Sequence, residues 1–454
     1  MEQQVNQQPS FFERNNTLLK GILIAFLVLV MLIPTAFIRA LISEREQRQQ
    51  EVTNEISNKW AKEQTIIGPV IVVPAYKYVT NANNQVVKTT HKLHFLPEQL
   101  NINGVVKPEV RHRSLYDVSV YRSELRIEGT INAEALTPIL NTVDSIDWGN
   151  AVFVTGITDS RGLDDNPVLT LGDTERRTDV SVYSSPFLKE TISAPIALSP
   201  SGKALFSLTL KLKGTGKLYF TPCGNTTTVN IKSQKGTPSY DGKYMPDKID
   251  GTAEAGFSAV WKVLHVSRGY PQYWSGDINQ GFEESAFGVR LIQQADHYTK
   301  TERSVKYAIL ILSLTFLVFF FIEIIQKKRV HPLQYVLVGI ALCVFYTLLL
   351  SISEYTGFNI AYVIAAFATV VLTGRYIYHT FKSTKVAALF SAALTSLYAY
   401  IFFLIQLKDY ALLFGSIGLF LIVAIIMHYS RNINWYQATG ENTMNGDENA
   451  ENKK

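Results

Sequence analysis

Three ionisable residues near the ends of long apolar segments are the first candidates for chemistry in this sequence. Glu323 lies close to the end of one apolar run, His331 opens the next run, and Glu354 follows the far end of that run. A charge in hydrocarbon costs several kcal/mol unless it is paired or hydrated, so ionisable groups at such depth are often functional. A structural role is favoured here, because Glu323 can pair with His331 or with Lys327 across a short connection.

Further polar side chains lie in the same part of the chain. Gln334 and Tyr335 follow His331 closely, and in membrane helices such groups more often join neighbouring helices than guide a substrate. Glu354 is separated from His331 by about 30 Å of helix, so these residues cannot form one site along a single helix. No predicted span has Asp, Lys or Arg at its centre, which an ion-coupled transporter usually needs.

The segment GITDSRG supplies the other candidates, Asp159 and Arg161, with Ser160 between them. A serine nucleophile needs a base within reach, and no local motif places His112 or His265 beside Ser160. Such a run between strand-like segments is more often a hydrogen-bonded turn, which is what we expect here.

Familiar catalytic and ligand-binding motifs do not occur in the sequence. It has no G-x-S-x-G, no glycine-rich phosphate loop and no H-x-x-x-H pair. Cys223 lies in a polar region and Cys343 in an apolar run, so we expect no disulfide between them. We therefore predict no catalytic residue, no metal site and no cofactor, and a protein that is not an enzyme.

The composition indicates a protein that is partly embedded in a membrane. With 47% hydrophobic residues and a mean hydropathy of +0.08, the chain is too apolar for one soluble domain and too polar to be mostly in the bilayer. The net charge of +5 is a mild excess, much of it beside apolar segments. Nothing in this pattern favours a nucleic-acid partner.

Six apolar segments are long enough, or nearly so, to cross a hydrocarbon core of about 30 Å. The first, 21–38, has no charge and is flanked by Lys20 and Arg39. The other five are 305–325, 332–352, 357–378, 386–405 and 410–428. Because the connections between these five are short, we expect neighbouring helices to run antiparallel.

Basic residues in the short connections predict the orientation, since Lys and Arg are retained on the cytoplasmic side. One side would hold Lys327, Lys328, Arg329, Arg375, Lys382 and Lys385, and the other only Lys408. We therefore expect both termini in the cytoplasm and residues 40–304 in the periplasm.

The predicted organisation has five parts: a cytoplasmic tail (1–18), a transmembrane anchor (19–39), a periplasmic β-rich domain (40–304) with a membrane-proximal helix at about 41–64, a five-helix bundle (305–428) and a disordered cytoplasmic tail (429–454). In the domain, apolar and polar residues alternate over 204–213, which we expect to form an antiparallel hairpin with 217–220. A first strand at 70–73 is expected to end at Pro74. The fold class is thus a membrane α-helical bundle plus an all-β, antiparallel, sandwich-like or extended exported domain.

Several stretches of the chain resemble one known family. They include TERSVKYAILILSLTFLVFFFIE at 301–323, HPLQYVLVGIALCVFYTLLLSISEYTGFNIAYVIAAFA at 331–368, GITDSRGL at 156–163 and GFSAVWKVLHVSRGYPQ at 256–272. These segments are similar to the CreD family of cell-envelope integrity proteins, and the likeness covers most of 40–370. It implies a bacterial inner-membrane protein linked to envelope integrity, colicin tolerance and a stress regulon that affects the β-lactam response, but it implies no molecular activity.

Three functional hypotheses follow. The leading one is a non-enzymatic inner-membrane protein that supports envelope integrity and the envelope-stress response. Its partners would be the lipid bilayer and a periplasmic or envelope component that the β domain binds or braces. The alternative is a transporter or lipid-handling protein with its working site in the helical bundle. A membrane-tethered hydrolase ranks below both.

Overall fold

The computed structural model describes residues 16–431, except 114, 181–182, 184–187, 189, 237, 253–255, 277–280, 292–295 and 408–409. The chain divides into two compact units. We call residues 1–48 and 295–454 the helical unit, and residues 49–294 the β unit. Most of the two predicted cytoplasmic tails lies outside the described residues.

One helix, α2 (Asn16–Trp60), replaces the two helices that were expected at the N-terminus. It runs without interruption for 45 residues and passes Pro34. The membrane-proximal helix predicted for about 41–64 is therefore the second half of α2 and ends at Trp60, because strand β1 (Gln64–Thr80) begins four residues later. The long segment after Arg39 contains neither Gly nor Pro, so nothing breaks the helix there.

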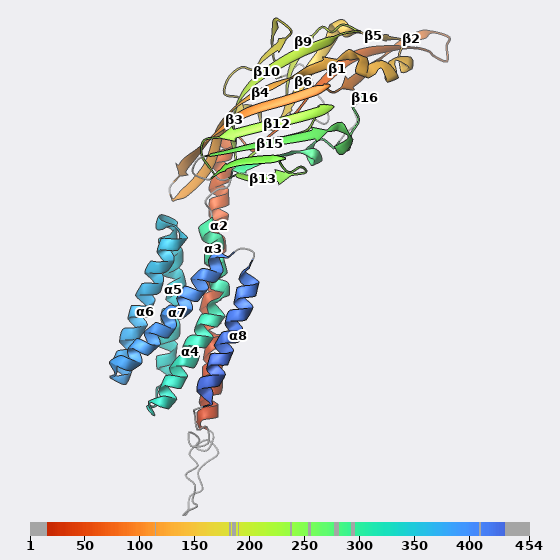
Figure 1. Cartoon of the computed structure of the whole chain (residues 1–454). Coiled ribbons are helices and arrows are strands. Elements are labelled where there is room, and N and C mark those ends of the chain that lie inside the picture. Colours follow the sequence, from red (N-terminus) through yellow and green to blue (C-terminus); the bar gives the residue numbers. More distant parts are fainter. Residues whose placement is uncertain are drawn as a thin grey trace, which may run out of the picture. The chain divides into compact units, whose positions relative to one another are not determined.

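The rest of the helical unit consists of helices that follow one another closely (Figure 1). They are α3 (Asp296–Lys306), α4 (Ala308–Ile325), α5 (Pro332–Thr356), α6 (Phe358–Phe381), α7 (Thr384–Gln406) and α8 (Ala411–Ser430). Among the described residues, six helices are long and apolar enough to cross a membrane: α2 and α4 to α8. These match the six predicted spans, with one correction: the span expected from 305 starts at Ala308, because the backbone breaks at Tyr307 between α3 and α4.

Close packing joins α2 to the C-terminal helices of the helical unit. Gly339 on α5 lies against Met31 of α2, so near that an added Cβ would be 2.8 Å from the methionine sulfur. Aromatic rings fill the space between the other helices; for example, Phe319 on α4 lies 4.5 Å, centroid to centroid, from Tyr335 on α5. The anchor helix and the bundle therefore share one apolar core.

Two sheets make up the described part of the β unit. The nine-stranded sheet has the order β13 (Pro238–Gly242), β17 (Phe287–Leu291), β11 (Lys217–Phe220), β1, β2 (Val86–Phe95), β16 (Tyr273–Ser275). Its other three strands branch from this order: β5 (Ser145–Ile146) and β6 (Ala151–Ile157) also pair with β1, and β9 (Glu190–Ile196) pairs with β6. The eight-stranded sheet has the order β14 (Lys248–Thr252), β15 (Gly256–Leu264), β12 (Thr226–Ser233), β3 (Gln99–Arg113), β4 (Tyr116–Asn132), β10 (Lys203–Thr215), β7 (Val168–Leu171), β8 (Thr174–Arg177).

The two sheets share one hydrophobic core, as in a sandwich. Phe206 of β10 meets Phe153 of β6 with ring centroids 5.3 Å apart, and Trp261 of β15 meets Phe287 of β17 at 5.7 Å. Every second residue of β10 points into this core, as the alternation predicted. The expected fold class, a helical membrane part plus an all-β sandwich-like domain, is confirmed.

Two predictions about strands are wrong. Residues 203–215 and 217–220 do not form a hairpin: β10 pairs with β4 and β7, whereas β11 lies in the other sheet, parallel to β1 and antiparallel to β17. Gly216, with φ of +68°, lets the chain cross between the sheets. Strand β1 also continues past Pro74 to Thr80, and the Pro74 carbonyl still accepts a hydrogen bond from the Asp147 N–H.

Candidate functional site

Glu323, near the end of α4, forms the centre of a buried polar cluster in the helical unit. Its side chain is 8% exposed. Its Oε1 accepts from Lys20 Nζ on α2 and from the Val330 N–H at 2.8 Å, and its Oε2 accepts from the Tyr335 hydroxyl at 2.9 Å. Lys20 also donates to the Val330 carbonyl at 2.9 Å. Both carboxylate oxygens are thus occupied by protein groups.

The partner of Glu323 is Lys20, and not His331 or Lys327 as the sequence had suggested. Lys20 is 303 residues away along the chain and was identified only as a flank of the first apolar segment. The one feature of the sequence that could have indicated this pairing is that Lys20 flanks a predicted span, and such a span must pack against other helices. A charge facing an apolar segment needs an opposite charge, because removing one partner of a buried pair costs about 3–5 kcal/mol.

His331 and Gln334 have a local role at the start of α5. The His331 ring Nδ1 accepts from the Leu333 N–H at 3.3 Å, while Gln334 Oε1 accepts from the His331 N–H at 3.1 Å. This is a reciprocal capping box, with Pro332 in the first turn of the helix. The two residues therefore end the connection from α4 and do not join the Glu323 cluster.

Glu354, at the other end of α5, forms a second polar contact with α2. Its Oε1 accepts from the Tyr298 hydroxyl of α3 at 3.1 Å and lies 3.8 Å from Arg45 Nε. Lys20 and Arg45 are both on α2, about 38 Å apart along a regular helix. The anchor helix is thus fixed to the bundle by a cation at each end of the helical unit.

Asp159 and Arg161 lie in the β unit, at the C-terminus of α2. Arg161 donates to Asp159 through Nε and Nη2, each at 2.8 Å, and through Nη1 to the Asn58 carbonyl at 2.6 Å. Asp159 also accepts from the Lys62 N–H at 3.0 Å, and its carbonyl accepts from Gln64 Nε2 at 2.9 Å. We call this arrangement the helix clamp.

The helix clamp is a hydrogen-bonded turn, as predicted, since Asp159 caps the short 3-10 helix Ser160–Gly162. Burial of the Asp159 carboxyl disfavours its charged form, but the hydrogen bonds from Arg161 and from the Lys62 N–H outweigh this and lower its pKa. The Ser160 N–H donates to the Glu190 carboxylate. These bonds hold the end of a helix in place, and they give Ser160 no base.

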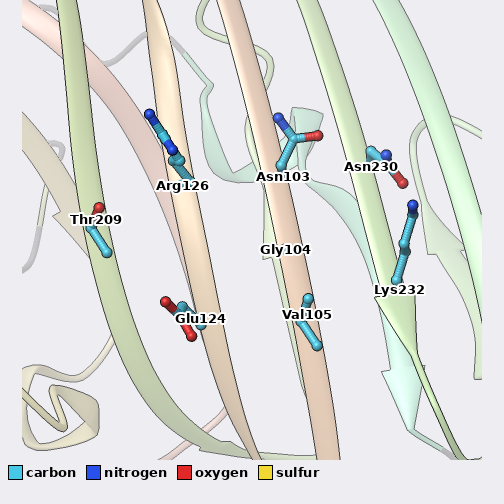
Figure 2. Close-up of a pocket in the computed structure, with 8 residues that line it drawn as sticks. All are labelled: Asn103, Gly104, Val105, Glu124, Arg126, Thr209, Asn230 and Lys232. Atoms are coloured by element: carbon cyan, nitrogen blue, oxygen red, sulfur yellow. The ribbon is translucent and has the colours of Figure 1, made fainter.

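The open face of the eight-stranded sheet carries a group of polar residues that sequence reasoning missed. Four neighbouring strands line a hollow of about 400 Å³. Its lining residues, which we call the polar face, are Asn103, Gly104 and Val105 of β3, Glu124 and Arg126 of β4, Thr209 of β10, and Asn230 and Lys232 of β12 (Figure 2).

Strand register brings these residues into rows. Asn103 lies opposite both Arg126 and Asn230, and Arg126 lies opposite Thr209. Figure 2 shows their side chains on the same side of adjacent strands. The Asn230 Oδ1 atom is shielded from solvent and has no hydrogen-bond partner in the described part of the chain.

The polar face offers both donors and acceptors. Amides and hydroxyls bind groups of either kind, while Arg126, Lys232 and Glu124 add charges of both signs. Such a surface suits a ligand rich in hydroxyl and amide groups. The signal was invisible in the sequence, because residues 103, 126, 209 and 230 meet only through pairings between distant strands.

Metal binding and redox chemistry would need clustered ligands or reactive cysteines, and the described residues offer little for either. They contain no group of three or more His, Cys, Asp or Glu side chains that could hold a metal ion. Cys223 and Cys343 are both free and buried, one in each unit. Burial raises the pKa of the Cys223 thiol to about 12, so this thiol is a poor nucleophile.

Comparison with known proteins extends over almost the whole chain. Residues 16–436 match the family model described as "Inner membrane protein CreD". The inner membrane protein CreD of Escherichia coli (strain K12) is 30% identical over 418 residues, which cover 90% of this chain and 91% of that protein. The resemblance noted in the sequence is thereby confirmed.

Proposed function

Since this chain belongs to the family of the inner membrane protein CreD, we propose that it supports cell-envelope integrity and the envelope-stress response as a non-enzymatic protein. Its apolar helices contact the lipid bilayer. In this proposal the β unit lies in the periplasm, where it binds or braces an envelope component. The observation that carries the binding step is the polar face of the eight-stranded sheet.

The chemistry of the polar face selects the class of ligand. Its amide, hydroxyl and charged groups can each exchange a water for a hydroxyl or amide of a ligand. A polymer that carries sugars and peptides, as the cell wall does, offers many such groups in a row. We propose a cell-wall polymer as the component that the β unit binds.

The test is co-sedimentation of the purified full chain in detergent with isolated cell-wall sacculi. A double variant, Asn103→Ala with Asn230→Ala, removes two neighbouring amides from the polar face. At about 1 kcal/mol for each lost hydrogen bond, binding should weaken about tenfold or more. The matched control is Asn141→Ala, which removes an exposed amide outside the polar face.

Two results would count against this function. Equal binding of the double variant and the wild type to sacculi would show that the polar face is not the binding surface. If the wild type does not bind sacculi, a cell-wall polymer is not the ligand of the β unit. The alternative function, a transporter or lipid-handling protein with its site in the bundle, stays a prediction, and the full pairing of Glu323 supports a structural role for that residue.

A further inference from the structure

Three helices of the helical unit, α4, α7 and α8, line an open cavity of about 850 Å³. Its walls are almost entirely hydrocarbon: the lining runs from Leu314 to Ile325 on α4, from Leu389 to Tyr400 on α7, and from Gly418 to Ile426 on α8. The volume falls in the range of about 300–1,000 Å³ typical of small-molecule sites. The cavity lies entirely within apolar helices that are long enough to span a membrane.

Helix α8 forms one wall of the cavity and is attached to α7 near its own start. The Tyr400 hydroxyl donates to the Phe414 carbonyl at 3.0 Å, and its ring lies against Gly418, where a Cβ would meet the hydroxyl oxygen. The rings of Phe403 and Phe414 also meet, with centroids 5.5 Å apart. In the spanning part of α8, none of the described residues is buried. Its second half therefore borders the cavity without closing it.

Four basic residues lie next, along the chain, to the ends of the three segments that line the cavity. Lys327 and Arg329 come two and four residues after Ile325, the last residue of α4, Lys385 lies one turn before Leu389 on α7, and Arg431 follows α8. All four are exposed. We call these four residues the basic end.

In the part of the chain that the structure describes, little negative charge offsets the basic end. Glu323 is the acidic residue near the end of α4, and its carboxylate is already bound by Lys20. A second contact holds the connections of the bundle together there: Lys328 Nζ donates to the Phe381 carbonyl at 3.2 Å. The basic end is thus a set of exposed positive charges that adjoins, along the chain, the segments lining an apolar cavity.

We propose that the cavity holds an acyl chain of an anionic phospholipid whose phosphate binds at the basic end. Lipid tails are as apolar as the cavity walls, so the chain itself gains little by moving from the bilayer into the protein. Selectivity then depends on the headgroup, because clustered Lys and Arg beside a membrane attract anionic lipids. This site is independent of the ligand of the β unit and goes beyond the function proposed above.

The test measures lipid retention by the purified full chain in detergent, using native mass spectrometry. The probes are phosphatidylglycerol and phosphatidylethanolamine with identical acyl chains. The wild type should retain phosphatidylglycerol at least tenfold more strongly. A joint Lys327→Gln and Lys385→Gln variant should lose most of this preference while it still binds both lipids weakly.

A matched pair of variants tests the cavity itself. Ala393→Trp places a large ring in the cavity, whereas Ala392→Trp places the same ring at the neighbouring exposed position outside the lining. Ala393→Trp should lower phosphatidylglycerol retention about tenfold, and Ala392→Trp should leave it unchanged. If Ala393→Trp does not yield folded protein, the headgroup preference and the lysine variants decide the question.

Three outcomes would overturn the proposal: equal retention of the two lipids by the wild type, equal retention by both tryptophan variants, or unchanged preference in the lysine variant. A change in oligomeric state with Ala393→Trp and unaltered lipid retention would instead assign the cavity to contact between two copies of the chain. None of these outcomes depends on sacculus binding, so the two proposals fail separately.

Discussion

Two carboxylates in the helical unit, Glu323 and Glu354, each face a cation of the anchor helix α2. The first meets Lys20 and the second lies 3.8 Å from Arg45. In a low-dielectric setting such a pair gains little net stability over apolar residues, but an unpaired member is costly. The Lys20–Glu323 pair therefore selects one position of α2 along the bundle, whereas the Arg45–Glu354 pair, whose arginine is half-exposed to solvent, contributes less.

Lys20→Met tests the value of this pairing. The substitution leaves Glu323 charged and buried without its cation, so the free energy of unfolding of the full chain in detergent should fall by about 3–5 kcal/mol. Adding Glu323→Gln should recover most of the loss, because the buried charge is removed while the glutamine Oε1 can accept from the Val330 N–H and its Nε2 can donate to the Tyr335 hydroxyl oxygen. Denaturant titration measures both effects.

Lys385→Met serves as the control, since this lysine is exposed at the same end of the unit. Its change in unfolding free energy should stay within about 0.5 kcal/mol. Equal stability of Lys20→Met and Lys385→Met would mean that the pair does not fix α2.

At the scale of elements, the helix clamp fixes the end of α2 within the β unit. Arg161 binds the Asn58 carbonyl, one of the carbonyls that a helix C-terminus leaves without a partner, and Asp159 accepts from the N–H of Lys62 just beyond the helix. The Thr215 hydroxyl of β10 adds a hydrogen bond to the Ala61 carbonyl. The last turn of α2 is therefore held by two separate parts of the β unit.

Asp159→Asn should show a defined dependence on pH. The pKa of Asp159 is lower in the folded protein than in the unfolded chain, so its contribution is present above the unfolded value of about 3.9 and is lost as pH falls through the folded value. At pH 7 the variant should lose about 1.5–3 kcal/mol of unfolding free energy, the usual worth of hydrogen bonds to a charged group.

The loss caused by Asp159→Asn should shrink as the pH is lowered below about 4, because protonation removes the same charge from the wild type. Unfolding followed by tryptophan fluorescence at pH 7 and near pH 3.5 measures this difference. A loss of equal size at both pH values would show that the charge of Asp159 does not stabilise the clamp.

Sequence patterns predicted element types better than their pairings. Apolar runs located the six long helices, and period-two alternation showed which residues of β10 face the core. Alternation carries no information on the neighbour of a strand, so β11 was paired with β10 although it lies in the other sheet. The polar face was missed for the same reason, and Lys20 because its partner is 303 residues distant.

At the scale of the whole molecule, the membrane orientation is a prediction that can be tested directly. The basic residues Lys327, Lys328 and Arg329 lie in the connection after α4, and Lys382 and Lys385 lie beside the connection after α6. Retention of such residues in the cytoplasm would leave residues 40–304 in the periplasm.

Alkaline phosphatase fused after Lys300 should be active, because the enzyme folds in the periplasm, and a fusion after Lys328 should be inactive. Comparable amounts of both fusion proteins on immunoblots provide the control. Activity of only the Lys328 fusion would reverse the orientation and would place the polar face on the cytoplasmic side.

Helix α2 continues from the helical unit into the β unit with no residue that breaks it after Pro34. A flexible linker would let a bound polymer pull on the β unit while the bundle stayed unaffected. The same helix thus carries the groups bound by the clamp at its end and, further back, both Arg45 and Lys20, so we expect a variant that interrupts α2 after Arg45 to separate the clamp from the two ion pairs.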